Sequence, residues 1–243
     1  MTVEAELSEG RRKEVVRQGI SVGVATGLYG VSFGALSVAS GLTVLQTQAL
    51  SLLMFTGGSQ FALVGILGAG GSGTSAIATA SLLGIRNGLY ALQVSQFLGA
   101  RGPKRLLAAH ITIDESTAVG IGQQEPRAQR IGFWVTGLAV LIGWNLMTFV
   151  GALAGNALGD PKTWGLDAAA AGAFCALLWP RLSTGDGRAA AVLAAFIALL
   201  TIPLVPAGIP VILAAIAAVI IGWIAHGRHE RGEPGLQGSD PTP

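Results

Sequence analysis

The chain has 243 residues, of which 51% are hydrophobic and 12% charged, whereas an average soluble domain carries about 25% charged residues. This composition, with a net charge of +2 and a single cysteine, excludes a disulfide-rich secreted scaffold, a nucleic-acid binder and a disordered chain. The charges are also segregated, because 68, 29 and 39 consecutive residues without Asp, Glu, Lys or Arg occupy 18–85, 131–159 and 189–227. Uncharged stretches of this length are typical of membrane spans, so the sequence predicts a multi-pass integral membrane protein.

About seven hydrophobic segments predict an all-α, multi-pass transmembrane helical bundle. Five of them are long enough to cross a hydrocarbon core of about 30 Å as helices: 18–40, 46–69, 74–98, 131–155 and 207–225. Two shorter stretches, 166–180 and 189–203, reach only about 22 Å. Short or interrupted segments are typical of a transporter's binding region, although each stretch could also run a few residues longer.

The two ends of the chain are polar. Residues 1–17 form a basic tail next to the first segment and carry no cleavable signal pattern, which is typical of a cytoplasmic anchor. Residues 228–243 are rich in Gly, Pro and charge and predict a disordered cytoplasmic tail. We therefore expect one transmembrane domain over 18–227, located in the cell membrane.

The basic loops raise a conflict about orientation. The N-terminal tail and loops 99–130, 181–188 and 226–231 are all basic and should face the cytoplasm. Three full crossings between residues 18 and 98 would place loop 99–130 on the opposite side. At least one segment is therefore expected to be broken or re-entrant: 46–69, which contains a pair of glycines, or part of 104–124.

That glycine pair lies within Thr56-Gly57-Gly58-Ser59-Gln60. Two consecutive glycines weaken a helix by roughly 1 kcal/mol each relative to alanine, so they would free backbone groups at bilayer depth. Free N–H groups at the start of a half-helix can hold a substrate carboxylate. Gly57, Gly58, Ser59 and Gln60 are therefore candidate substrate-binding residues, and a simple packing kink is the alternative.

Arg86 is the thirteenth of 25 residues in segment 74–98, near the bilayer centre, where an arginine costs at least about 2.5 kcal/mol. It belongs to a polar stripe on one helix face, together with Thr79, Tyr90 and Gln93, and Asn87 flanks it. A guanidinium that faces a transport path can bind a substrate carboxylate through two parallel hydrogen bonds. This makes Arg86, Asn87 and Tyr90 candidate substrate-binding residues.

Four other ionisable residues are candidates for proton coupling: His110, Asp114, Glu115 and Asp167. The three acids among them are also candidates for a structural ion pair with Arg86. With a spacing of i and i+4, His110 and Asp114 would share one helix face and could relay a proton. A solvated interfacial helix over 111–122 is the alternative. Asp167 opens a short apolar segment, where it would also favour the helix dipole.

Other patterns are structural or absent. Small residues at helical spacing in segment 18–40 predict close helix packing, with a cavity lined by Ser32-Phe33-Gly34 as the alternative. The sequence contains no Gly-Lys-Ser or Gly-Lys-Thr phosphate-binding loop and no metal-ligand spacing. Ser59 is a weak candidate for a protease nucleophile, because the nearest downstream histidine, His110, lies outside a clear span. We therefore expect no enzymatic activity, no cofactor and no metal.

Five short motifs occur in order over residues 18 to about 180: Ser32-Phe33-Gly34 followed by Gly41-Leu42, Phe55 to Phe61, Arg86 to Tyr90, Asp114-Glu115-Ser116, and Gly165-Leu166-Asp167. On these motifs the chain resembles the AzlC family of branched-chain amino-acid permeases, the large subunit of a two-component exporter. The resemblance implies export of valine, leucine, isoleucine or similar neutral amino acids, and a small membrane partner of the AzlD type. A proton-coupled secondary exporter is the preferred hypothesis. The alternatives are an importer or channel for another small solute, and an assembly subunit without a conduction path.

Overall fold

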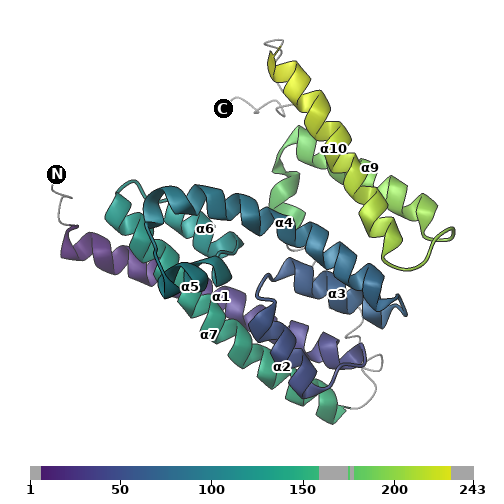
Figure 1. Cartoon of the computed structure of the whole chain (residues 1–243), viewed down its shortest axis with the longest axis horizontal. Helices are drawn as coiled ribbons and strands as arrows, with labels where there is room; N and C mark the ends of the chain where they lie inside the picture. Colours follow the sequence, from purple (N-terminus) through teal and green to yellow (C-terminus); the bar gives the residue numbers. More distant parts are fainter. Residues whose placement is uncertain (1–6, 159–174, 176–177, 231–243) are drawn as a thin grey trace, which may run out of the picture.

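A computed structural model describes residues 7–158, 175 and 178–230 of the chain (Figure 1). Within these residues every regular element is a helix, which confirms the expected all-α bundle. The helices are α1 (Glu9–Ala39), α2 (Val44–Leu53), α3 (Gly58–Gly68), α4 (Gly73–Leu98), α5 (Pro103–His110), α6 (Asp114–Ile121), α7 (Pro126–Leu158), the 3-10 helix η2 (Trp179–Ser183), α9 (Gly185–Thr201) and α10 (Ile209–Glu230). By length and apolar composition, α1 and α7 are suited to cross a membrane.

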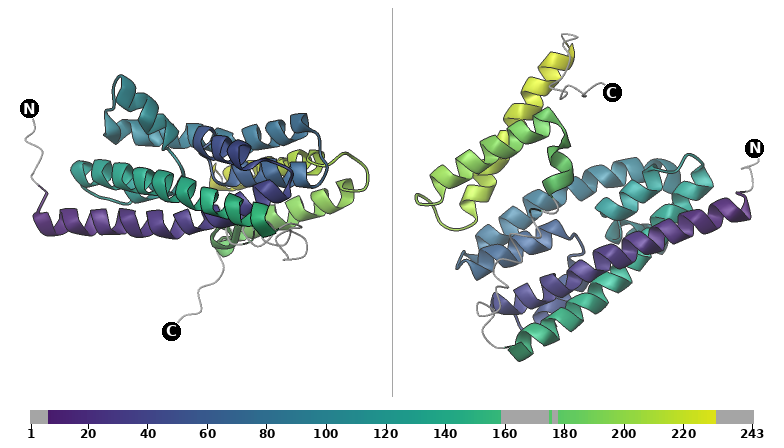
Figure 2. Two further views of the ribbon diagram at one scale, coloured as in Figure 1. Left: turned by 90° about the horizontal axis from the view of Figure 1, so that it is seen from below. Right: turned by 180° about the vertical axis from the view of Figure 1, so that it is seen from behind.

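Helices α1 and α7 run parallel and side by side, as Figures 1 and 2 show. At their first turns, the Arg11 guanidinium donates a hydrogen bond of 2.9 Å to the side chain of Gln123, just before α7 begins. At their far ends, a Cβ atom added at Gly155 would lie 3.0 Å from the Cα of Ala35. Because α1 ends at the far end of the bundle and α7 begins at the near end, the chain between them must cross the bundle an odd number of times.

Glycines allow this close approach of α1 to α7. A Cβ atom at Gly27 would lie 3.0 Å from the backbone of Gly143, and one at Gly30 would lie 2.6 Å from the carbonyl oxygen of Trp144. Small residues let two backbones pack closely where lipid provides no hydrophobic driving force. The expected packing role is confirmed for all five glycines of the stripe, which are buried along α1: Gly19, Gly23, Gly27, Gly30 and Gly34.

Segment 46–69 is broken, as the sequence predicts. Helix α2 ends at Leu53, and α3 begins at Gly58 after an irregular stretch in which Gly57 has φ +58°, a conformation that favours glycine. Helix α3 then returns to the end of the bundle where α2 began, because a Cβ atom at Gly68 would lie 2.6 Å from the Ser40 hydroxyl. We call α2 and α3 the first hairpin.

A second broken element follows α4 and corrects one expectation. His110 ends α5 and Asp114 begins α6, so the two residues do not share a helix face. Hydroxyl groups stabilise the break between them: Thr112 donates to the Ala108 carbonyl at 2.7 Å, and Ser116 donates to the Ile111 carbonyl at 2.6 Å. These bonds satisfy backbone groups that a continuous helix would pair internally. We call α5 and α6 the second hairpin.

The two hairpins enter the bundle from opposite ends, and their tips meet. The base of the second hairpin lies where α4 ends and α7 begins, since the Arg130 guanidinium donates to the Phe97 carbonyl at 2.8 Å. At the tips, the Phe55 and His110 rings lie 5.8 Å apart. Only α1 and α4 run the full length of the bundle before residue 99, so basic loop 99–102 lies at the same end as the start of α1. This arrangement places loop 99–102 at the end that its basic residue and those at the start of α1 predict.

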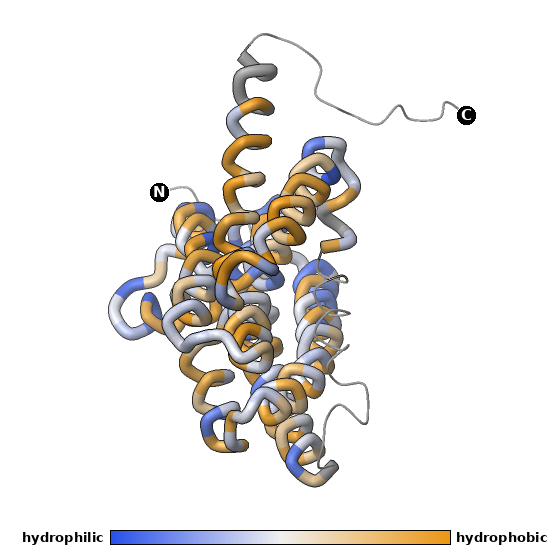
Figure 3. The backbone as a smooth tube through the Cα atoms, turned by 90° about the vertical axis from the view of Figure 1, so that its right-hand side faces the viewer, coloured by the Kyte–Doolittle hydropathy of each residue, from blue (hydrophilic) through white to orange (hydrophobic). Residues whose placement is uncertain are grey.

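The remaining helices flank this core. Helices α9 and α10 pack on each other beside α4, where the Thr79 hydroxyl donates to the Gly208 carbonyl at 3.3 Å (Figure 1). Hydrophobic residues cover most of the helices, and hydrophilic residues gather mainly at loops and helix ends (Figure 3). Helix α1 begins nine residues before its expected start, because Ser8 caps it and the basic tail continues the helix. Most of segment 166–180 and of the tail 228–243 lies outside the described residues.

Candidate functional site

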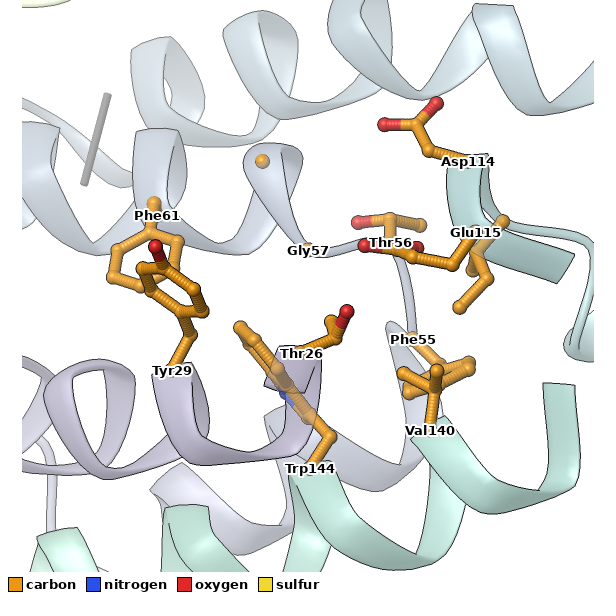
Figure 4. A pocket seen from close by; sticks show the side chains of 12 residues that line it. Thr26, Tyr29, Phe55, Thr56, Gly57, Phe61, Asp114, Glu115, Val140 and Trp144 are labelled. Carbon is orange, nitrogen blue, oxygen red and sulfur yellow. The ribbon is translucent and has the colours of Figure 1, made fainter. Parts of the chain in front are cut away.

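A cavity of about 190 Å³ lies where the two hairpin tips face α1 and α7 (Figure 4). We call it the central pocket. Its lining residues stand near the middle of the two long helices and at both breaks: Thr26, Tyr29, Phe55, Thr56, Gly57, Gly58, Phe61, Ile113, Asp114, Glu115, Val140 and Trp144. Pockets for drug-sized ligands typically measure about 300–1,000 Å³, so this one suits a single small solute.

The N-terminus of α3 opens into the central pocket through Gly57 and Gly58. No side chain caps this helix, and its first bond within the helix runs from the Gln60 N–H to the Gly57 carbonyl at 3.0 Å. The N–H groups that precede Gln60 have no acceptor within the helix. Together with the helix dipole, they form a backbone site for an anion.

Arg86 joins α4 to the tips of both hairpins. Its Nη1 atom lies 3.0 Å from a carboxylate oxygen of Asp114, and its Nη2 atom donates to the Thr56 carbonyl at 3.5 Å. This confirms the structural ion pair that the sequence left open, with Asp114 as the partner. Because Asp114 compensates its charge and Arg86 does not line the pocket, the N-terminus of α3 is the better site for a substrate carboxylate.

Glu115 is the second acidic residue of the pocket. Its side chain extends from the first turn of α6 toward Thr56 (Figure 4). Asp114 is paired with Arg86, whereas no ion pair involves Glu115 among the residues that the structure describes. Glu115 is thus placed to receive a positively charged group of a bound solute.

The other predicted site residues lie away from the pocket lining. Gln60 is buried, and its amide donates to the carbonyls of Leu50 and Ser51 at 3.1 and 3.4 Å, which ties α3 to the end of α2. Ser59 is also buried, and its hydroxyl lies on the side of α4, 3.8 Å from a Cβ atom added at Gly84. The hydrogen bonds give Gln60 a structural role in the first hairpin, whereas the buried Ser59 hydroxyl has no hydrogen-bond partner among the described residues.

Three further candidates do not reach the pocket lining, and one cannot be placed. Asn87 and Tyr90 lie on α4 beyond Arg86 and do not line the pocket. His110 packs against the Phe55 ring at the hairpin tips. Asp167 lies outside the described residues.

The walls contributed by α1 and α7 were not identified from the sequence as site residues. Trp144 is the clearest case, because the other four tryptophans fall at or near the ends of predicted segments and this one falls in the middle of 131–155. Because tryptophan is enriched at the membrane interface, a tryptophan in the middle of a predicted span is the feature of the sequence that could have identified Trp144. Thr26 and Val140 lie in ordinary apolar stretches of sequence, and no sequence feature distinguishes them from their neighbours.

The chain is similar to one known protein family. The family model described as AzlC protein matches residues 21–158, more than half of the chain, and this range includes every residue that lines the central pocket. No curated protein and no solved structure matches the chain. The chain therefore belongs to the AzlC family, whose members act in membrane transport of branched-chain amino acids.

Proposed function

We propose that the protein exports branched-chain or similar neutral amino acids across the cell membrane, and that the substrate binds in the central pocket. Family membership supports the substrate class and the direction. The chemistry of the pocket, which suits a small zwitterion with an apolar side chain, supports the site. A small membrane partner of the AzlD type would complete the exporter.

The observation that carries the proposal is that one small cavity combines three complementary surfaces. The uncapped N-terminus of α3 suits the substrate carboxylate, and Glu115 suits the ammonium group. Apolar residues, including Phe61, Val140 and Trp144, suit the side chain. A neutral amino acid needs all three surfaces at once.

Glu115 also offers a way to couple export to protons. When the pocket is empty, the Glu115 carboxyl group can carry a proton in the place of a substrate cation. The ammonium group of an entering amino acid would displace that proton, so substrate and proton would compete for one carboxylate. Competition of this kind gives proton exchange, in which a proton enters as the amino acid leaves.

The two hairpins offer a way to open the pocket to each side in turn. Each tip forms one wall of the pocket and each base lies at a different end of the bundle. Transporters with broken helices bind their substrate where such helices meet near the bilayer midplane. Movement of one hairpin would expose the pocket to the end at which that hairpin has its base.

The backbone anion site can be tested by substitution of Gly58, the first residue of α3. Gly58→Pro removes one N–H group, at a position where proline suits a helix start. Gly58→Ala keeps the N–H group and is the matched control, since both variants place a Cβ atom 3.2 Å from the Arg86 guanidinium. A hydrogen bond to a charged group contributes about 1.5–3 kcal/mol, so valine efflux should fall roughly 10- to 100-fold in the proline variant alone.

The same efflux assay separates the alternatives. Valine movement against its gradient that an uncoupler abolishes supports a secondary exporter, whereas movement only down the gradient indicates a channel. Equal transport per complex in Gly58→Pro and in the unmutated protein, with fewer complexes formed, would indicate an assembly subunit instead.

A further inference from the structure

We infer that two aromatic rings, Phe61 and Trp144, with a third ring, Phe33, packed behind them, form a wall of the central pocket, and that Phe61 sets the size of the side chain that the pocket accepts. This inference rests on the proposed function, because it assigns the part of the same pocket that distinguishes one neutral amino acid from another.

The three rings come from three different helices and contact one another. Phe33 of α1 stacks on Trp144 of α7 with ring centroids 5.7 Å apart, and it meets Phe61 of α3 edge to face at 5.5 Å. Phe61 and Trp144 meet edge to face at 6.0 Å. Phe33 is completely buried, and Phe61 and Trp144 are 2% and 4% exposed. A wall packed this tightly from three elements yields little to a larger ligand.

The polar groups of the pocket direct a substrate toward this wall. In Figure 4, Asp114 and Glu115 lie at one end of the cavity and Phe61 lies at the other, with Gly57 between them. An amino acid with its carboxylate at the start of α3 and its ammonium group at Glu115 therefore points its side chain at Phe61.

The size of the cavity then determines the substrate class. The pocket measures about 190 Å³, and Phe61, with Tyr29 beside it, lies at the end that receives the side chain (Figure 4). Branched aliphatic side chains fill such a space and gain apolar contact with the rings. Phenylalanine and other large aromatic side chains would overlap with Phe61 and are excluded.

The test is Phe61→Leu, with Phe133→Leu as the matched control. Both phenylalanines are buried and meet a tryptophan edge to face, since Phe133 lies 5.7 Å from the Trp134 ring. Phe133 belongs to a separate apolar cluster and does not line the pocket. The two variants therefore lose the same atoms from similar surroundings, and only one of them enlarges the cavity.

The measurement is efflux of labelled valine and labelled phenylalanine from cells that express the full chain with its small partner. A change of one methylene in an apolar pocket alters discrimination by about 10- to 200-fold. We therefore expect Phe61→Leu to raise the ratio of phenylalanine to valine efflux at least tenfold, and Phe133→Leu to leave it unchanged. Phe61→Met, which nearly conserves volume, should give a smaller shift in the same direction and serves if the leucine variant does not accumulate.

The possible failures are distinguishable. If the unmutated protein exports valine and both Phe61 variants keep its phenylalanine-to-valine ratio, the inference about the aromatic wall is overturned while the proposed function stands. An equal shift in Phe133→Leu also overturns the inference, because the shift then does not depend on the pocket. If the unmutated protein moves no neutral amino acid, the proposed function itself fails.

Discussion

The parallel contact between α1 and α7 predicts that Gly30→Ala destabilises the protein. A Cβ atom at Gly30 would lie 2.6 Å from the carbonyl oxygen of Trp144 and 3.0 Å from the backbone nitrogen of Thr148. Ordinary van der Waals contact begins at 3.4 Å, so the two backbones would have to separate by about 0.8 Å at this point. Neither contact can be relieved by rotation of a side chain, because both involve the backbone of α7.

Forced expansion of a packed interior typically costs about 1–3 kcal/mol. For a chain of this length, each kcal/mol corresponds to about 2–4 °C in Tm. Gly65→Ala is the control, because nothing lies within 4 Å of a Cβ atom at that position of α3 and alanine favours a helix.

The assay is thermal unfolding of the purified full chain in detergent, followed by loss of helical circular dichroism. Gly30→Ala should lower the Tm by several degrees, and Gly65→Ala should leave it equal or raise it. An unchanged Tm in Gly30→Ala would refute the close contact between the two helices. Since Trp144 and the neighbouring Tyr29 both line the central pocket, valine efflux should fall together with the Tm.

Two further predictions concern the hairpins. The ion pair between Arg86 and Asp114 is about one-third exposed, so Arg86→Gln and Asp114→Asn should be coupled by about 1–2 kcal/mol in a double-mutant cycle of unfolding; additive effects would mean that the pair does not join the tips. Leu42 and Ala69 lie at the two ends of the first hairpin. In a cysteine-free background, Leu42→Cys and Ala69→Cys should therefore react with an impermeant maleimide from the same side of the membrane. Reaction from opposite sides would mean that this hairpin crosses fully.

The first break was predictable because its cause is local. Gly57 and Gly58 weaken a helix wherever they occur in sequence, and the positive φ of Gly57 is a conformation that glycine adopts at low cost. The second break has no glycine or proline at Thr112. It depends on hydroxyl groups that replace backbone hydrogen bonds, and a sequence cannot show whether Thr112 and Ser116 use their hydroxyls in that way.

The site was predictable in its polar half only. An arginine at bilayer depth requires a partner that compensates its charge, and the sequence offers three acids as candidate partners of Arg86. Which of them pairs with it, Asp114, depends on how the second hairpin meets α4. The apolar half depends on the alignment of α1 with α7, which places Thr26 and Trp144 at one cavity although 117 residues separate them in sequence. Periodicity identifies a buried face but not the helix that it faces.

In the proposed binding mode, a neutral amino acid lies in the pocket with its ammonium group at Glu115. The most direct test is uphill efflux of labelled valine by Glu115→Gln and by Glu125→Gln, at equal membrane levels. Glu125 is the control, because it lies just before α7, 3.7 Å from Arg11 and outside the pocket. We predict that uphill efflux falls at least tenfold in Glu115→Gln, as expected for the loss of a charge-assisted contact of about 1.5 kcal/mol or more, and is unchanged in Glu125→Gln. Unchanged uphill efflux in Glu115→Gln would contradict the assignment of the pocket as the substrate site.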